Sequence, residues 1–262
     1  MRKLLIILLL GLAYVNVYGQ GEIDEQQRIF YRNERTGAIF LNSNGIGLGF
    51  QYGKRVNASL KTIYSLEVAN IKHPKEVKVT NQFASNKSFV YGKQNNFFTL
   101  HGGIGRQKEI FRKFDRGGIA VRYFYTGGVS LGFIKPIYYE VYNAVGPGID
   151  FVYLEDRKFD PSIHQGDIFG RSGFFKGFDE ISLAPGAYAR VGFNFEYSTL
   201  DELIHAIEVG IAAEAFARKI PIMATQENFP FFFSLFLSYR FGKVINPLDT
   251  ESLSPVDNLF LD

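Results

Sequence analysis

Seven charged residues lie on the polar side of segments in which apolar and polar residues alternate. They are Glu67, Arg122, Arg190, Glu196, Glu208, Glu214 and Arg240. Four carboxylates and three guanidinium groups nearly cancel, and an arginine can hold a carboxylate through two parallel hydrogen bonds. Buried charges are costly unless they are paired. The pattern therefore predicts an enclosed network of ion pairs that plugs an interior and fixes strand register. A polar ion path is the alternative.

A second cationic group lies in the polar stretch 72–88. Its lysines are Lys72, Lys75, Lys78 and Lys87. Only Glu76 opposes them within the stretch. Basic side chains near an anionic surface gain favourable Coulomb energy. We expect this stretch to contact the phosphates of an anionic lipid surface, and a solvated loop without a ligand is the alternative.

The other reactive residues form no recognisable catalytic or metal site. The histidines are His73, His101, His164 and His205. No two of them stand two, three or four residues apart, so metal-ligand spacing is missing. The absence of Cys excludes disulfides, thiolate metal sites and a lipidated cysteine. A Ser–His–acid site assembled from Ser88 and His73 is one of many such combinations, so we expect no catalysis and no cofactor.

The elements that must position the seven charges are β-strands. The clearest alternation runs from Phe231 to Gly242, where Phe, Leu and Tyr occupy every second place. The other segments with this pattern are 46–53, 62–69, 119–133, 187–197 and 206–215. Adding a first strand near Arg35–Ser43 and a weaker one near Phe89–His101 gives an even count of eight, which places both termini on the same side of a membrane barrel.

The amino-terminal residues carry the pattern of a secretory signal peptide. Arg2 and Lys3 precede an apolar stretch from Leu4 to Leu12, and a cleavage site is expected near Gly19. A membrane anchor is the alternative, although the apolar stretch is short for one. The leader holds two of the 29 Lys and Arg residues and none of the 26 Asp and Glu residues, so the remaining chain carries a formal charge of +1. This near-neutral balance gives no indication of a nucleic-acid partner.

Alternation alone does not tell which face of the strands is inside, because a soluble lipocalin-like barrel alternates in the same way. Lysine placement separates the two. The segments without lysine are 119–133, 187–197, 204–217 and 231–241. A water-facing strand surface would carry several lysines. The sequence therefore predicts an all-β, antiparallel, up-and-down transmembrane β-barrel in the outer membrane of a Gram-negative bacterium.

The connections sort by length, with short turns expected in the periplasm and long loops outside. The longest outer loop covers about 135–180 and is rich in aromatic residues. Its alternating pieces 137–141 and 149–154 predict a hairpin above the membrane, or two further wall strands that would make ten. The predicted organisation is a signal peptide (1–19), a periplasmic segment (20–34), the barrel (35–243) and a periplasmic tail (244–262).

Five stretches carry a resemblance to known proteins. They are Asn44–Phe50, Lys72–Lys78, Val121–Gly128, Ile220–Met223 and Ser238–Lys243. With these stretches, most of the chain after Glu34 resembles an outer-membrane β-barrel family of Bacteroidota, in the size class of the OmpX, OmpA and PorT barrels. The resemblance implies an integral outer-membrane location and, for barrels of this kind, service as accessory subunits of barrel-assembly or secretion machines. It implies no enzymatic activity and identifies no functional residue.

These observations lead to a ranked set of functional hypotheses. The first is a non-enzymatic structural or interaction barrel, an accessory subunit of an outer-membrane assembly or secretion complex. The second is a small channel or transporter for solutes, and the third is a lipid-modifying barrel enzyme. The expected partners are outer-membrane lipid, lipopolysaccharide and other outer-membrane or periplasmic proteins.

Overall fold

The computed structural model describes residues 33–80, 88–113, 117–144, 152–163, 165–200 and 202–245. The predicted leader, nearly all of the predicted segment 20–34 and the tail beyond residue 245 lie outside these residues. None of the described helical residues forms a helix long and apolar enough to cross a membrane.

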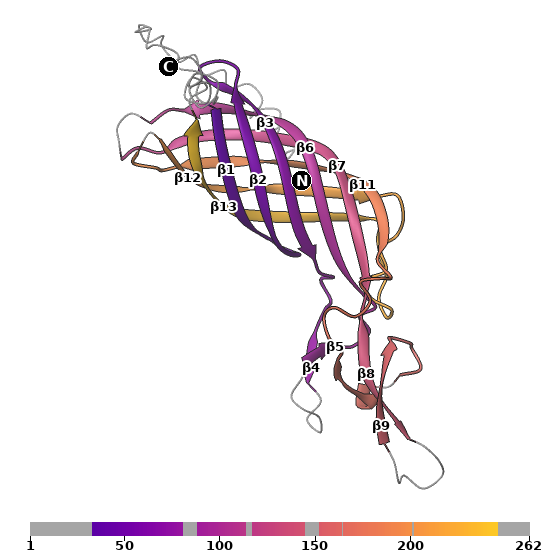
Figure 1. Ribbon diagram of the computed structural model, residues 1–262. Coiled ribbons are helices and arrows are strands. Elements are labelled where there is room, and N and C mark those ends of the chain that lie inside the picture. Colours follow the sequence, from indigo (N-terminus) through magenta and orange to yellow (C-terminus); the bar gives the residue numbers. More distant parts are fainter. Residues whose placement is uncertain are drawn as a thin grey trace, which may run out of the picture. The chain divides into compact units, whose positions relative to one another are not determined.

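Eight antiparallel strands close into a barrel, which confirms the fold predicted from the alternation (Figure 1). The wall strands are β1 (Asn33–Asn42), β2 (Gly45–Arg55), β3 (Leu60–Ile71), β6 (Asn95–Phe111), β7 (Ala120–Pro136), β11 (Ser182–Glu196), β12 (Leu203–Phe216) and β13 (Phe231–Ile245). Their order around the barrel is β1–β13–β12–β11–β7–β6–β3–β2. Because β1 pairs with β13, every wall strand has two hydrogen-bonded neighbours and the sheet has no free edge.

The two ends of the barrel differ. We call the end where Asn33 pairs with Ile245 the terminal end, and its three connections are the short ones between β2 and β3, β6 and β7, and β11 and β12. Three of the four connections at the opposite end are long: 72–94, 137–181 and 217–230. Their described residues are called the cap below. Short turns at one end and long loops at the other follow the pattern of membrane barrels.

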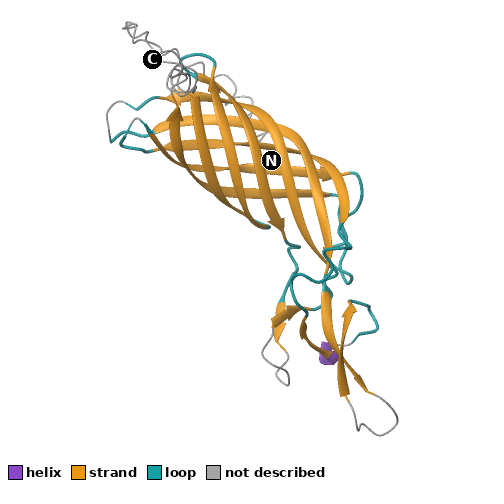
Figure 2. Ribbon diagram, viewed as in Figure 1, coloured by secondary structure: helices purple, strands orange, loops and turns teal. Residues whose placement is uncertain are grey.

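The cap contains secondary structure of its own (Figure 2). Its elements are β4 (Lys78–Thr80), β5 (Ser88–Val90), β8 (Tyr138–Ala144), β9 (Val152–Lys158), β10 (Ile168–Arg171) and the 3-10 turn η1 (Gln165–Asp167). β8 pairs antiparallel with β9 and with β10, apart from the wall. The ten-strand alternative is therefore wrong, and the hairpin alternative is correct. A buried apolar cluster that includes Phe89, Tyr139 and Ile168 holds the cap together.

Strand β6 departs most from its prediction. The alternation indicated a weak strand near 89–101, whereas β6 runs from Asn95 to Phe111. Glycines interrupt the apolar pattern after His101, yet the backbone continues to pair with both β3 and β7. Gly103 also makes room inside the barrel, since a Cβ atom there would lie 2.2 Å from the hydroxyl oxygen of Tyr188. Glycine at position 103 thus reflects packing inside the barrel, and the strand does not end there.

The two faces of the wall differ sharply in polarity. On the outside, apolar side chains are open to the surroundings, with exposed fractions of 71% for Val129, 69% for Phe233 and 66% for Leu235. On the inside, charged side chains such as Glu208 and Arg190 are buried. An outer surface this apolar requires hydrocarbon around it, because exposed apolar patches of this extent are rare on soluble monomers.

Candidate functional site

The structure places all seven charged residues of the predicted network inside the barrel. Their exposed fractions lie between 1% for Glu208 and 8% for Glu196. They come from strands β3, β7, β11, β12 and β13, which point alternate side chains inward. The network is not one continuous cluster but a series of separate groups, spread from the terminal end toward the cap end.

The pair of Arg240 and Glu208 is the most completely bonded of these groups. Arg240 Nε donates to Glu208 Oε1 at 2.7 Å and Nη2 donates to Oε2 at 2.9 Å, which is the bidentate geometry expected of arginine and carboxylate. Arg240 Nη1 donates to Thr36 Oγ1 at 3.0 Å, and Asn194 Nδ2 donates to Glu208 Oε1 at 2.9 Å. These bonds connect β11, β12, β13 and β1, which are consecutive strands of the wall.

Arg190 forms the second group, with Glu67 from the opposite wall. Arg190 Nη1 donates to Glu67 Oε1. The guanidinium carbon of Arg190 lies 3.9 Å from the ring centroid of Phe236 and 5.1 Å from that of Phe40. Aromatic faces attract cations, so the two rings supplement the carboxylate in stabilising the buried charge.

Glu214 has a partner that sequence reasoning did not assign. Glu214 Oε2 lies 3.0 Å from His101 Nε2, and the imidazole stacks on the ring of Tyr188 at a centroid distance of 4.7 Å. The Tyr188 hydroxyl in turn lies 2.9 Å from Ser65 Oγ. His101 was missed as a network member because its strand, β6, was predicted to end at that residue.

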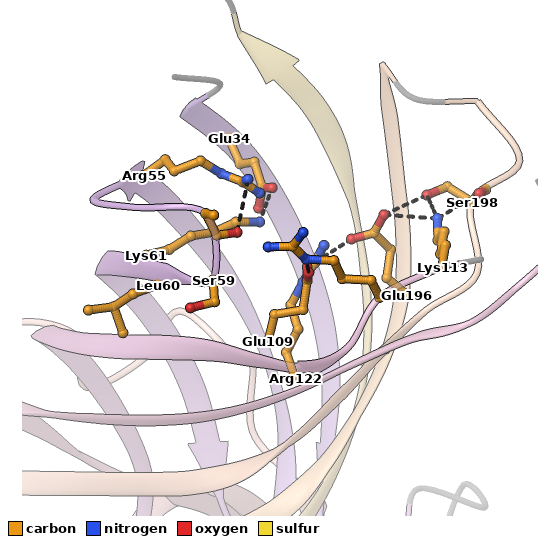
Figure 3. Close-up of polar contacts among 12 residues, drawn as sticks. Glu34, Arg55, Ser59, Leu60, Lys61, Glu109, Lys113, Arg122, Glu196 and Ser198 are labelled. Atoms are coloured by element: carbon orange, nitrogen blue, oxygen red, sulfur yellow. Dashed lines mark hydrogen bonds and ion pairs between the residues drawn. The ribbon is translucent and has the colours of Figure 1, made fainter. Parts of the chain in front are cut away.

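A denser cluster lies at the terminal end (Figure 3). Arg122 pairs with Glu196 and lies 3.5 Å from Glu109, while Lys113 Nζ donates to Glu196 Oε1 at 3.0 Å. In the same view, Lys61 Nζ donates to the carboxylate of Glu34, the second residue of β1. The alternation of inward and outward side chains could have identified Lys61 as inward-facing, since it precedes the predicted strand 62–69 by one residue. Glu109 lies beyond the predicted limit of β6.

An apolar plug fills the cap end of the barrel. Phe97 is fully buried and its ring centroid lies 5.1 Å from that of Phe216 and 5.6 Å from that of Phe232. The buried side chains of Ile220, Ile222 and Met223 pack in the same cluster. Backbone hydrogen bonds from Gln94 N to Ile222 O (2.9 Å) fasten segment 220–223 in place. The interior therefore contains ion pairs, an apolar cluster of Ile63, Phe124, Ala212 and Phe236, and a group of aromatic rings at the cap end.

Three of the four lysines predicted to form an outer contact loop, Lys72, Lys75 and Lys78, lie in the cap. Lys72 and Lys78 line a cavity of about 600 Å³, whereas Lys75 lies outside it and donates to Gln226 Oε1 at 3.0 Å. Lys87 is outside the described residues. Glu76, the acid of this stretch, accepts a hydrogen bond from Lys93 Nζ at 2.7 Å. Lys93 comes from the turn between β5 and β6 and was missed, because it lies beyond the basic stretch.

Metal-ligating side chains do not gather anywhere in the described ranges, where no group of three or more Asp, Glu or His residues could hold an ion.

Burial raises the pKa of the Tyr139 hydroxyl, which lies 2.7 Å from the Lys93 carbonyl oxygen and 2.8 Å from that of Val90. Tyr139 therefore stays protonated and fastens β8 to the turn that carries Lys93.

No protein-family model and no curated protein matches the chain. Among solved structures, Neisserial surface protein A is similar at 11% identity and a TM-score of 0.36, over 81% of this chain and 96% of its own. Ail, the attachment invasion locus protein of Yersinia pestis, gives 9% and 0.39, over 82% and 99%. The N-terminal β-barrel domain of Pseudomonas aeruginosa OprF gives 8% and 0.34, over 82% and 98%. The likeness is one of fold alone.

Proposed function

We propose that the protein is an integral outer-membrane barrel with a closed interior, whose role is structural or one of interaction through its cap. The observation that carries this proposal is the filling of the barrel: the inward arginines meet carboxylates, and Phe97, Phe216 and Phe232 occupy the cap end. An eight-stranded barrel is just wide enough for side chains to fill its interior, so such filling leaves no aqueous path.

The outer-membrane location rests on the wall and on the leader-like start of the chain. Side chains such as Val129 and Leu235 point outward along the whole length of the strands. Tyr52 and Tyr64 lie together near the terminal end, at a centroid distance of 6.4 Å, in the position of an interfacial aromatic girdle. On this proposal the terminal end faces the periplasm and the cap faces outward.

An interaction role is supported by the construction of the cap. Its two small sheets and their apolar cluster give it a defined surface, in contrast to a loop that merely joins strands. Loops positioned by a rigid scaffold commonly carry binding functions. We propose that this surface and the periplasmic ends of the chain make the protein an accessory subunit of an outer-membrane assembly or secretion complex, and that it catalyses no reaction.

Conductance in a planar lipid bilayer tests the closed interior. The reconstituted wild-type protein should show no steady single-channel current, and Arg122→Ala, which removes one interior cation, should stay silent. Glu227→Ala, a change at an exposed cap residue, is the matched control. A steady current in the wild type that changes in Arg122→Ala would refute the plug and favour the channel hypothesis.

Native pull-down with mass spectrometry tests the interaction role. The full-length protein, extracted in mild detergent, should co-purify with other outer-membrane or periplasmic proteins. A deletion of residues 246–262 separates contacts made by the tail from contacts made by the cap. Isolation as a lone monomer would contradict the accessory-subunit proposal, and lipid acylation or hydrolysis above background would favour the enzyme hypothesis.

A further inference from the structure

The cavity in the cap lies where three parts of the chain meet. It is lined by residues of the β3–β6 connection, of β8 and of β10, and its volume is about 600 Å³. Small-molecule sites typically measure roughly 300–1,000 Å³ and combine apolar walls with a few polar groups. The cavity therefore has the size and the position of a ligand site, in the cap and away from the end where Asn33 pairs with Ile245.

The charges that line this cavity do not balance. Four cations, Lys72, Lys78, Lys93 and Arg171, face a single carboxylate, Glu76. That carboxylate is already engaged by Lys93 and by the backbone N–H of His73 at 3.0 Å. Lys72, Lys78 and Arg171 form no ion pair with any described residue. A compact anion would complete the arrangement, because a charge-assisted contact to a phosphate is among the stronger polar interactions.

The crowding of cations affects the buried lysine directly. Burial lowers the pKa of Lys93, and the neighbouring Arg171 and Lys72 lower that pKa further, against the opposing effect of Glu76. A bound anion would relieve this repulsion.

An unpartnered amide points to the same ligand site. Asn96 lines the cavity and is 7% exposed, and its Nδ2 has no hydrogen-bond partner within the described residues. Buried donors are nearly always satisfied in folded proteins, so an unsatisfied one calls for a partner such as a ligand oxygen. Asn70, with a second amide, lines the cavity beside it.

Aromatic rings form part of the cavity wall. Phe89 and Tyr139 meet edge to face at 6.1 Å, and the ring of Phe174 lies 5.8 Å from the guanidinium carbon of Arg171. Flat apolar rings beside amides and cations suit a ligand that combines an apolar ring face, hydroxyl groups and an anion. A sugar phosphate has these three features, whereas a fatty acid lacks the hydroxyl groups and inorganic phosphate lacks the ring.

We propose that this cavity binds a phosphorylated saccharide, with the phosphate held by Arg171 and Lys78 and the ring hydroxyls held by Asn96. The proposal rests on the proposed function only in placing the cap at the outer surface, and it does not depend on a closed interior. The same chemistry occurs in the head group of lipopolysaccharide and in a soluble sugar phosphate. The two sources are separated below.

Calorimetry on the full-length protein in detergent, with glucose 6-phosphate as the probe, tests the site. Glucose should bind at least about tenfold more weakly than glucose 6-phosphate, since a hydrogen bond to a charged group contributes about that factor. Arg171→Gln and Asn96→Asp should each lower affinity by about tenfold for the same reason. Lys75→Gln removes one positive charge from a cap residue outside the cavity and should leave affinity unchanged. Equal affinity for glucose and its phosphate, or an unaffected Arg171→Gln, would overturn the proposal.

Vesicles containing lipopolysaccharide identify the source of the ligand. If the ligand is lipid-linked, the protein in nanodiscs should bind these vesicles, and both glucose 6-phosphate and the Arg171→Gln change should reduce that binding. Binding of glucose 6-phosphate without binding of the vesicles would assign a soluble sugar phosphate. Circular dichroism and heat-modifiable migration establish that each variant is folded. A conducting barrel that still binds glucose 6-phosphate would refute the closed interior and leave this site intact.

Discussion

The barrel interior and the cap cavity differ in how their charged side chains are paired. Inside the barrel, Arg240 is matched by Glu208 and Arg190 by Glu67, with no side chain left as an isolated ion among these pairs. In the cavity, Lys72, Lys78 and Arg171 pair with no carboxylate of the described residues. Pairing is required where water is excluded, because an isolated buried ion is very costly. Excess charge is tolerated only where solvent or a ligand can reach it.

This difference indicates which region is structural and which is available for binding. The interior ion pairs hold wall strands together, although some buried atoms there, such as Arg190 Nη2, have no hydrogen-bond partner within the described residues. The cavity differs in its charge, because Lys72, Lys78 and Arg171 form no ion pair with a described residue. Changes that leave a charge unpaired should therefore have large effects on stability in the barrel and smaller effects in the cap.

The largest effect is expected from Glu208→Ala. Removing this carboxylate leaves Arg240 and Asn194 buried without their acceptor, so the free energy of unfolding should fall by about 3–5 kcal/mol. Urea unfolding in detergent micelles measures the loss. Glu227→Ala, at an exposed carboxylate of the cap, should change stability by less than about 0.5 kcal/mol.

A double replacement separates lost pairing from lost packing. Glu208→Leu combined with Arg240→Met should recover most of the stability lost in Glu208→Ala, because no unpaired charge remains. A double variant as unstable as the single one would mean that the charges themselves, rather than their matching, hold the barrel.

The next largest effect is expected on the outer wall. Leu237 is half exposed near the middle of β13, and Leu237→Arg should destabilise the inserted barrel by about 2–4 kcal/mol, the cost of an arginine at the bilayer midplane. Val77→Arg adds the same cation to an exposed apolar position of the cap and should be nearly neutral. Unfolding from phospholipid vesicles measures both. Similar losses at the two positions would contradict the membrane placement of the wall.

A smaller effect, with a second readout, is expected from Glu76→Gln. The change weakens the bond to Lys93 in a partly buried site, and the free energy of unfolding should fall by about 1–3 kcal/mol. Affinity for glucose 6-phosphate should rise, because the only carboxylate of the cavity is gone. A fall in that affinity would show that Glu76 positions Lys93 for binding rather than competing with the anion.

The smallest effect concerns pH. The hydrogen bonds from Lys158 and Tyr138 lower the pKa of Glu180 in the cap. The resulting stabilisation is present above the unfolded pKa of about 4.3 and is lost as pH falls through the lower folded value. Since the group is exposed, only a slight loss of amide-exchange protection in β9 is expected between about pH 6 and pH 3. Glu180→Gln should abolish the pH dependence, and an unchanged dependence would assign it to another group.

The wall could be predicted from the sequence because its signal is local. Alternation in segments such as 119–133 and 231–242 depends only on neighbouring residues, and it also gives the inward parity of Arg122 and Arg240. The partners of these arginines could not be predicted, because they depend on the registers of other strands. Glu34 and Glu109 lie at strand ends, where the pattern is weakest.

The cap cavity could not be predicted for a different reason. Lys78, Lys93 and Arg171 come from separate turns and short strands, and only the packing of these connections brings them together. The basic stretch 72–88 indicated a cationic surface but not a cavity. Lys75, which belongs to the same stretch, points elsewhere.

The pairing of β1 with β13 has a consequence for biogenesis. This pairing joins the first and last strands of the wall. The hydrogen bond from Arg240 to Thr36 crosses it between residues 204 positions apart. Such a long-range contact forms only after the whole wall has been translated and brought together. A chain that stops before Phe231 would leave β1 and β12 as unpaired edge strands, and each could pair with a strand of another molecule.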